Sequence, residues 1–163
     1  MPAPRVMLVS SKYPPEYSGS GLRAHNTYVR LSEKFGVEFT TLCGSVEHVQ
    51  SSDYEWAGRL VRRIAAPLAK RRSLPDSSGS LTRLAGRLLN RAQSWSDFWR
   101  ITPRVWSFLN SQRQNFDLLH IFGNAPVTAA AFAYAKMQRL PALLELVNLS
   151  TNPRLYEPLF MQL

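Results

Sequence analysis

The chain has 163 residues, of which 45% are hydrophobic and 19% charged, so it is long enough for a single domain with a buried core. Its one cysteine, Cys43, excludes a disulfide framework, and its three histidines are scattered without metal-ligand spacing, so we expect no metal site. There is no signal-peptide pattern and no run of about 20 apolar residues, which predicts a cytoplasmic protein.

The formal net charge of +9 is concentrated in one segment. Residues 59–113 carry twelve Lys and Arg side chains but only two aspartates, whereas the rest of the chain is close to neutral. This segment also contains three of the four tryptophans, Trp95, Trp99 and Trp106. Within a single domain over residues 1–163, we therefore expect a basic, Trp-bearing helical segment at about 70–113.

The first 35 residues predict a buried strand, a long loop and a helix. Residues 6–9 are continuously apolar, as in a parallel strand that is covered on both faces. A proline-containing loop follows, and apolar residues then recur at helical spacing from Gly21 to Phe35. The free N–H groups at the start of this helix predict an anion site at Gly19, Ser20 and Gly21.

The same glycines allow two other interpretations. The sequence GSGLRA at residues 19–24 satisfies the G-x-G-x-x-G/A pattern of dinucleotide-binding proteins. In that motif the first glycine follows the strand directly, whereas eight residues, 11–18, intervene here, and Cys-Gly-Ser at 43–45 stands where a ribose-binding carboxylate belongs. The second alternative is a glycine turn that is needed only for close packing of the helix on the strand.

Strands and helices alternate along the rest of the chain. Further strands are expected at residues 37–42, 60–65, 118–122 and 143–147, with residues 44–58 irregular. Helices are expected at residues 81–92, 94–112 and 126–139, and Pro103 predicts a kink or a restart in the second of these. This alternation predicts an α/β fold, a Rossmann-like parallel sheet with helices on both faces and with sites at the carboxyl ends of its strands.

Polar residues lie at or near the ends of the last two predicted strands. His120 and Asn124 accompany the strand at 118–122, and Asn148 follows the strand at 143–147. Glu145 lies inside an otherwise apolar strand, where a buried carboxylate needs a partner. The alternatives are structural: His120 as a core histidine with its hydrogen bonds satisfied, Asn124 as a helix cap, and Glu145 directed outward past the sheet edge.

Three segments together resemble a known family. VMLVSSKYPPEYSGSGLRAH, at residues 6–25, is similar to the start of family-4 glycosyltransferases of the GT-B type, in which a strand, a proline pair, a glycine loop and a His-bearing helix follow one another. FDLLHIFGNAPVTAAAFAYAK, at 116–136, resembles their next landmark, and LPALLELVN, at 140–148, resembles the strand after it. The resemblance covers nearly the whole chain, and the basic middle is its least family-like part.

The resemblance implies one half of a GT-B fold, the acceptor-side domain of a retaining glycosyltransferase. Such an enzyme transfers a sugar from a nucleotide-sugar to a glycan or lipid-linked acceptor, with no other cofactor and no obligatory metal. The nucleotide-sugar is held mainly by a C-terminal donor-binding domain, so we expect this chain to be inactive without that domain or a partner subunit that supplies it.

The resemblance also implies roles for individual residues. Gly19, Ser20 and Gly21 would face the donor diphosphate, while His25 and Asn124 would line the cleft or the acceptor site. A histidine is common in the family just after the last of these strands, and Asn148 stands there in this chain. The catalytic candidates are His120, Asn148 and Glu145.

The basic middle has three interpretations. Its apolar face can pack on the domain while the arginine row is solvated, as in most amphipathic helices. It can dock on an anionic membrane surface, for which the candidate residues are Arg83, Arg87, Arg91, Trp95, Trp99 and Trp106. Nucleic-acid binding is supported by charge but by no recognised motif. A non-catalytic membrane or partner-binding module on the same fold therefore remains the alternative function.

Overall fold

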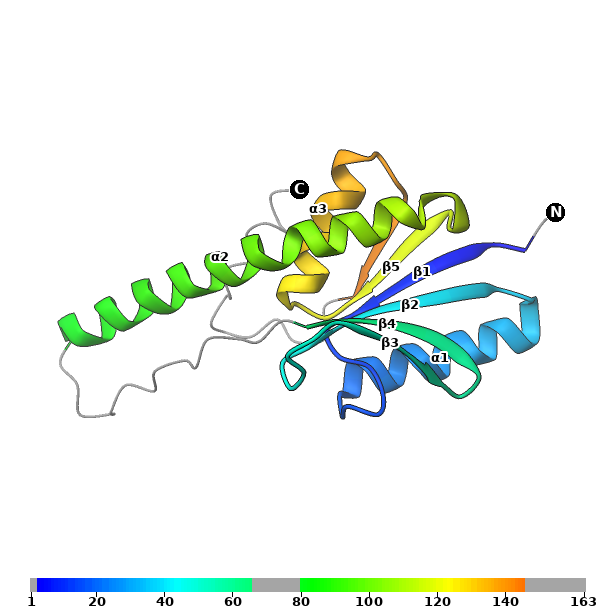
Figure 1. Ribbon diagram of the computed structural model, residues 1–163, viewed down its shortest axis with the longest axis horizontal. Coiled ribbons are helices and arrows are strands. Elements are labelled where there is room, and N and C mark those ends of the chain that lie inside the picture. Colours follow the sequence, from blue (N-terminus) through cyan, green and yellow to red (C-terminus); the bar gives the residue numbers. More distant parts are fainter. Residues whose placement is uncertain (1–2, 66–79, 146–163) are drawn as a thin grey trace.

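The computed structural model describes residues 3–65 and 80–145, with the backbone alone at 80–94. A six-stranded sheet in the order β3-β4-β2-β1-β5-β6 has helices on both faces (Figure 1). All neighbouring strands are parallel except β3, which is antiparallel to β4. The strands are β1 (Arg5–Ser10), β2 (Glu38–Ser45), β3 (Ser52–Trp56), β4 (Arg59–Ala65), β5 (Leu118–Phe122) and β6 (Ala142–Glu145). The predicted Rossmann-like α/β fold class is confirmed.

The central strand β1 carries both hydrophobic cores. Its residues from Val6 to Ser10 are all buried, as expected for a parallel strand that is covered on both faces. Val6 and Leu8 belong to the core under helix α1, whereas Met7 and Val9 belong to the core on the opposite face. Strand alternation thus divides one apolar run between two layers.

The expectation of an irregular stretch at residues 44–58 is wrong, because Ser52–Trp56 forms strand β3. The strand makes a hairpin with β4 through a two-residue turn at Ala57 and Gly58, whose φ angles are 49° and 72°. Positive φ at both turn residues matches the twist of hairpin strands. Only alternate residues of β3 are partly buried, so the strand lacks the apolar run that predicts the inner strands.

Helix α1 (Gly19–Phe35) covers one face of the sheet. Ser18 caps its start by accepting a hydrogen bond from the Gly21 N–H, and Gly36, with φ of 69°, ends it in the left-handed conformation. Its buried face, which includes Ala24 and Tyr28, packs on the core under β1 and β2.

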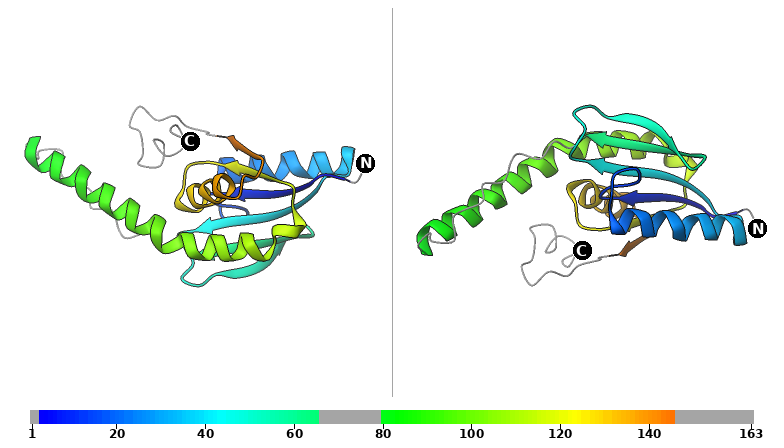
Figure 2. Two further views of the ribbon diagram at one scale, coloured as in Figure 1. Left: turned by 90° about the horizontal axis from the view of Figure 1, so that it is seen from above. Right: turned by 90° about the horizontal axis from the view of Figure 1, so that it is seen from below.

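Helices α2 (Ser80–Ser111) and α3 (Pro126–Met137) cover the opposite face, and a 3₁₀ turn, η1 (Arg113–Asn115), leads into β5. The expectation of two separate helices at 81–92 and 94–112 is wrong, because α2 is continuous through Pro103. Figure 2 shows that α2 changes direction along its length, as expected where proline removes a backbone donor. Its first half extends beyond the sheet (Figures 1 and 2).

Among the described residues, no helix combines the length and apolar character that crossing a membrane requires.

Candidate functional site

The strand order places a topological switch point at the carboxyl end of β1. β1 pairs with β2 on one side and with β5 on the other, and the helices that follow β1 and β5 lie on opposite faces of the sheet. Ligands of open parallel sheets bind at such a point, where the loops after the two strands diverge. The segments to consider are therefore the loop at residues 11–18, the start of α1, and the residues after β5.

The glycines of the predicted anion site have different surroundings. A Cβ atom at Gly21 would lie 2.3 Å from the backbone oxygen of Lys12, so the small size of Gly21 serves the close packing of α1 on the loop. A Cβ atom at Gly19 would meet nothing within 4 Å. The close-packing interpretation thus applies to Gly21, whereas Gly19 borders open space.

Several segments converge around the start of α1. A Cβ atom at Gly123, just after β5, would lie 3.2 Å from the Ser11 Oγ and 3.9 Å from the Ser20 Oγ. The Ser20 hydroxyl is 2.9 Å from the Ser18 hydroxyl. In the described part of the chain, the N–H groups of Gly19 and Ser20 have no acceptor, which leaves them available to an anion.

His120 and Glu145, two of the three catalytic candidates, lie near each other. His120 is buried in the middle of β5, and its Nδ1 is 2.8 Å from the Tyr28 hydroxyl. Its Nε2 has no hydrogen-bond partner among the described residues and is 3.8 Å from the Glu145 Oε2. Burial lowers the pKa of His120 to about 4, so its imidazole is neutral near pH 7. Glu145 ends β6 and forms an ion pair with Arg23 of α1.

The other residues to which the resemblance assigns a role lie in different surroundings. His25 is buried, with its Nδ1 2.7 Å from the Tyr13 hydroxyl, and burial and then the charge of Arg59 lower its pKa. This contact ties α1 to the loop after β1. Asn124 is half-buried, and the N-cap of α3 is its neighbour Ala125. Asn148 lies outside the described residues.

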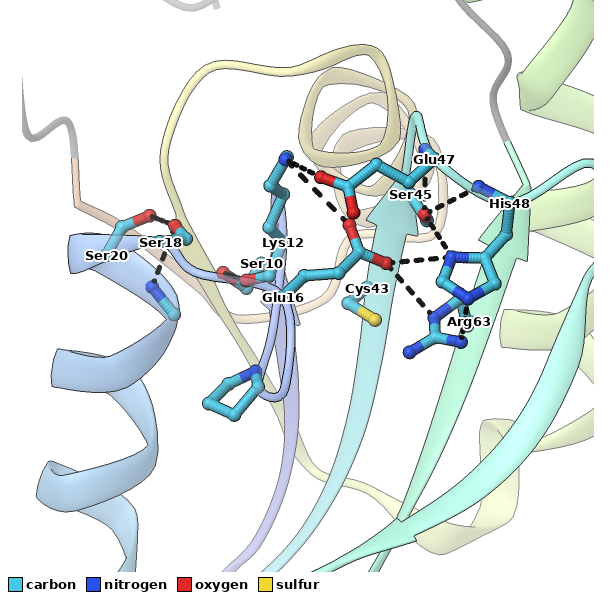
Figure 3. A network of polar contacts seen from close by, with 12 residues as sticks. Ser10, Lys12, Glu16, Ser18, Ser20, Cys43, Ser45, Glu47, His48 and Arg63 are labelled. Carbon is cyan, nitrogen blue, oxygen red and sulfur yellow. Dashed lines mark hydrogen bonds and ion pairs between the residues drawn. The ribbon is translucent and has the colours of Figure 1, made fainter.

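An ion-pair network with a buried central pair, Glu16 and Arg63, adjoins this site, and its members are not among the predicted site residues (Figure 3). The Glu16 carboxylate, from the loop after β1, lies between Lys12 on one side and His48 and Arg63 on the other. Its Oε1 is 3.3 Å from the Arg63 Nε and 3.1 Å from the His48 Nδ1, while its Oε2 is 3.9 Å from the Lys12 Nζ. Glu16 and Arg63 are each only 7% exposed.

Hydrogen bonding determines which nitrogen of His48 carries the proton. The Arg63 Nη1 is 2.9 Å from the His48 Nε2, and a guanidinium can only donate, so Nε2 accepts. The proton is then on Nδ1, which faces the Glu16 carboxylate and lies 2.9 Å from the Ser45 Oγ. The network thus ties the loop after β1 to the carboxyl ends of β2 and β4.

Nothing local in the sequence marks these three residues as partners. Glu16 is a single carboxylate in a loop, His48 lies in the stretch expected to be irregular, and Arg63 lies within a strand. The signal in the sequence is Arg63 itself, because it shares a strand face with the apolar Val61 and Ala65, where a charge needs a partner. Nearby Cys43 offers no reactive thiol, because burial raises its pKa to about 12.

The membrane-surface candidates are divided between two environments. Trp106 packs inside the domain, where its Nε1 donates to the Ala130 carbonyl at 2.9 Å. Trp99 is 64% exposed and stacks on the half-buried Trp95. The three arginines belong to the part of α2 whose backbone alone is described, Arg83, Arg87 and Arg91.

No protein-family model matches the chain, and no curated protein matches it at a significant level. Within residues 3–65 and 80–145, no group of three or more His, Cys, Asp or Glu side chains is placed to hold a metal ion.

Proposed function

We propose that this chain is the acceptor-side domain of a retaining glycosyltransferase, which transfers a sugar from a nucleotide-sugar to a glycan or lipid-linked acceptor. The observation that supports the proposal best is that the Gly19 and Ser20 N–H groups, at the switch point, have no acceptor among the described residues, with Ser20 close to Gly123. An anion placed there meets backbone donors and the positive end of the α1 dipole.

The chemistry of the reaction matches these donors. When the bond between the sugar and the diphosphate breaks, negative charge develops on the leaving phosphate oxygen, and preorganised N–H groups stabilise it. The acceptor hydroxyl forms the new glycosidic bond, and its proton passes to the phosphate oxygen of the departing diphosphate. Neutral His120, in the middle of β5, and the Glu145 carboxylate, at the end of β6, are the candidate polar groups for this reaction.

The proposal requires a donor-binding domain, either in the same polypeptide or in a partner subunit. The chain alone would then hold a nucleoside diphosphate weakly, through the phosphate contacts only. We expect a millimolar dissociation constant for UDP or GDP, measured by amide chemical shifts. The shifts should be largest at Gly19, Ser20 and Gly123.

A proline substitution tests the backbone donor directly. Gly19 is the first residue of α1, where proline is well tolerated, and Ser18 has ψ of 122°, which suits a following proline. Gly19→Pro therefore removes one N–H while keeping the helix start, and Gly19→Ala keeps the N–H as the matched control. We expect at least a tenfold loss of UDP affinity in Gly19→Pro only, because a hydrogen bond to a charged group contributes about 1.5–3 kcal/mol.

Two results would count against the proposal. One is the absence of UDP- and GDP-dependent shifts in these amides at millimolar nucleotide. The other is equal nucleotide affinity of the Gly19→Pro and Gly19→Ala proteins.

A second candidate function is a basic module that docks on the cytoplasmic face of a membrane. It is favoured by the first half of α2, which extends beyond the sheet and carries Arg83, Arg87 and Arg91 at four-residue spacing, and by the exposed ring of Trp99. This function needs no nucleotide-sugar.

Vesicle sedimentation separates this function from simple solvation of the arginines. The protein should sediment with vesicles that contain phosphatidylglycerol and not with pure phosphatidylcholine. Replacing the three arginines by Gln should abolish sedimentation, whereas Lys at the same positions should preserve it. Sedimentation that survives the Gln substitutions would refute docking through this row, and a gel shift with DNA in its place would identify a nucleic-acid partner.

A further inference from the structure

A groove with a volume of about 550 Å³ lies on the opposite face of the sheet from α1, between β4 and the second half of α2. Its volume is in the range of small-molecule sites. Arg62 and Ile64 line it from β4, and Arg104, Ser107 and Phe108 line it from α2. The start of α1 and the ion-pair network of Glu16 contribute nothing to its lining.

The two arginines bring more N–H donors to the groove than the described residues use. The Arg62 Nη1 donates to the Asp53 Oδ2 at 2.9 Å, but its buried Nε has no hydrogen-bond partner in the described part of the chain. The Arg104 Nη1 donates to the Ala65 carbonyl at 3.3 Å. Each guanidinium has five N–H donors, so both retain the capacity to bind an oxyanion.

The rest of the groove is partly apolar. Pro103 and the Phe108 ring contribute apolar surface from α2, whereas Ile64 is only 2% exposed and offers little surface to a ligand. The Arg62 guanidinium lies 5.9 Å from the centroid of the Phe108 ring, which combines a cation and an aromatic surface at one end. The Ser107 hydroxyl adds a polar group that can donate to an anion.

We infer that this groove binds a phosphomonoester that carries an apolar substituent. The phosphate pairs with the guanidinium groups of Arg62 and Arg104, and the substituent lies against Pro103 and Phe108. The same chemistry is found in a soluble aryl or alkyl phosphate and in the headgroup of a phosphatidic acid. The inference is independent of the proposed glycosyl transfer, because the groove shares no residue with the diphosphate site.

Calorimetric titration of the full chain with phenyl phosphate tests the inference. Inorganic phosphate lacks the apolar contact and should bind at least tenfold more weakly. We expect Arg104→Gln to weaken phenyl phosphate binding about tenfold, because it removes a charge-assisted contact. Arg100→Gln is the matched control, since Arg100 is an exposed arginine of the same helix outside the groove, and it should leave the affinity unchanged.

A second variant should change the affinity for phenyl phosphate in the opposite direction. Asp53→Asn weakens the hold on the Arg62 guanidinium and should tighten phenyl phosphate binding about threefold, because a competing carboxylate charge is removed. Circular dichroism of each variant checks the fold. Dihexanoyl phosphatidic acid identifies the lipid source if it binds more tightly than phenyl phosphate and with the same loss in Arg104→Gln.

The inference is overturned if inorganic phosphate binds as tightly as phenyl phosphate. It is equally overturned if neither organic phosphate binds, or if Arg104→Gln and Arg100→Gln have the same affinity.

Discussion

Gly19 and Gly21 are two residues apart, but only Gly19 has room for a side chain. A methyl group at Gly21 would lie 2.3 Å from the Lys12 oxygen, a backbone atom that cannot move without displacing the loop. We expect Gly21→Ala to lower the free energy of unfolding by about 2–3 kcal/mol, as overpacking does. Urea unfolding measures the change.

Gly19→Ala is the matched control at the same helix end. It meets open space, and reducing the freedom of the unfolded chain should make it neutral or about 0.5 kcal/mol stabilising. Equal destabilisation by both substitutions would contradict the contact between Gly21 and Lys12.

His120 makes stability depend on pH. Its pKa is lowered to about 4 by burial, whereas in the unfolded chain it is near 6.5, so the folded state binds the proton more weakly. Stability is therefore complete above pH 6.5 and falls as the pH drops from 6.5 toward 4. Allowing for partial solvent screening, we expect a loss of about 1–2 kcal/mol.

The His120→Gln protein isolates this contribution. Glutamine does not titrate and can still hydrogen-bond to the Tyr28 hydroxyl, so urea unfolding at pH 7 and pH 4.5 should show a smaller pH effect in the variant. The lowered pKa of His25 acts in both proteins and cancels in the comparison. An unchanged difference between the two pH values would assign the pH dependence to other groups.

At the scale of elements, the packing of α2 against α3 depends on Trp106. Its Nε1 donates to the Ala130 carbonyl, and its ring contacts Tyr134 with the centroids 6.1 Å apart. We expect Trp106→Phe to cost about 1–2 kcal/mol, because it removes a partly buried hydrogen bond. Trp99→Phe, at a largely exposed position of the same helix, should be neutral in stability.

Thermal unfolding of both tryptophan variants tests the contribution of this packing to stability. Vesicle sedimentation of the same variants tests the second candidate function. A stability loss in Trp99→Phe that equals the loss in Trp106→Phe would contradict the packing. Loss of vesicle binding in Trp99→Phe alone would support Trp99 as the residue that meets the membrane.

Elements differ in how well the sequence predicts them, and the reason is burial. Strands β1 and β5 are apolar at consecutive positions because both of their faces are covered, so the pattern is visible. β3 is partly buried only at alternate residues and contains two acidic residues, so its sequence does not distinguish it from a loop. Pro103 suggests a helix end, but packing of the second half of α2 on α3 keeps the helix continuous.

At the scale of the whole molecule, the Glu16 and Arg63 pair joins the loop after β1 to a strand two positions away in the sheet. Both side chains are nearly fully buried, so removing one charge leaves the other without compensation. We expect Glu16→Gln to lower the free energy of unfolding by about 3 kcal/mol.

Glu47→Gln is the control for the loss of one carboxylate. Glu47 also pairs with Lys12, but its side chain is 60% exposed, so its loss should not change stability measurably. Denaturant unfolding of the two variants compares them, and equal stability of both proteins would show that the buried pair is dispensable.

Much of the candidate site could be predicted from the sequence, because parallel strands bring their carboxyl ends to one edge of a sheet. That rule brings Ser20 near Gly123, and His120 near Glu145, once the strands are assigned. It does not say which way a side chain faces. The structure places the buried His25 with its Nδ1 beside the Tyr13 hydroxyl, a contact that strand order alone does not predict.

The sequence by itself determined the fold class, the central strands and the start of α1, because these depend on local apolar periodicity and on glycine and serine at a helix end. Only the tertiary structure decided the ion-pair network of Glu16, His48 and Arg63 and the groove between Arg62 and Arg104. The physical reason is that these features join residues far apart in the chain, and their distances depend on strand order and register rather than on local sequence.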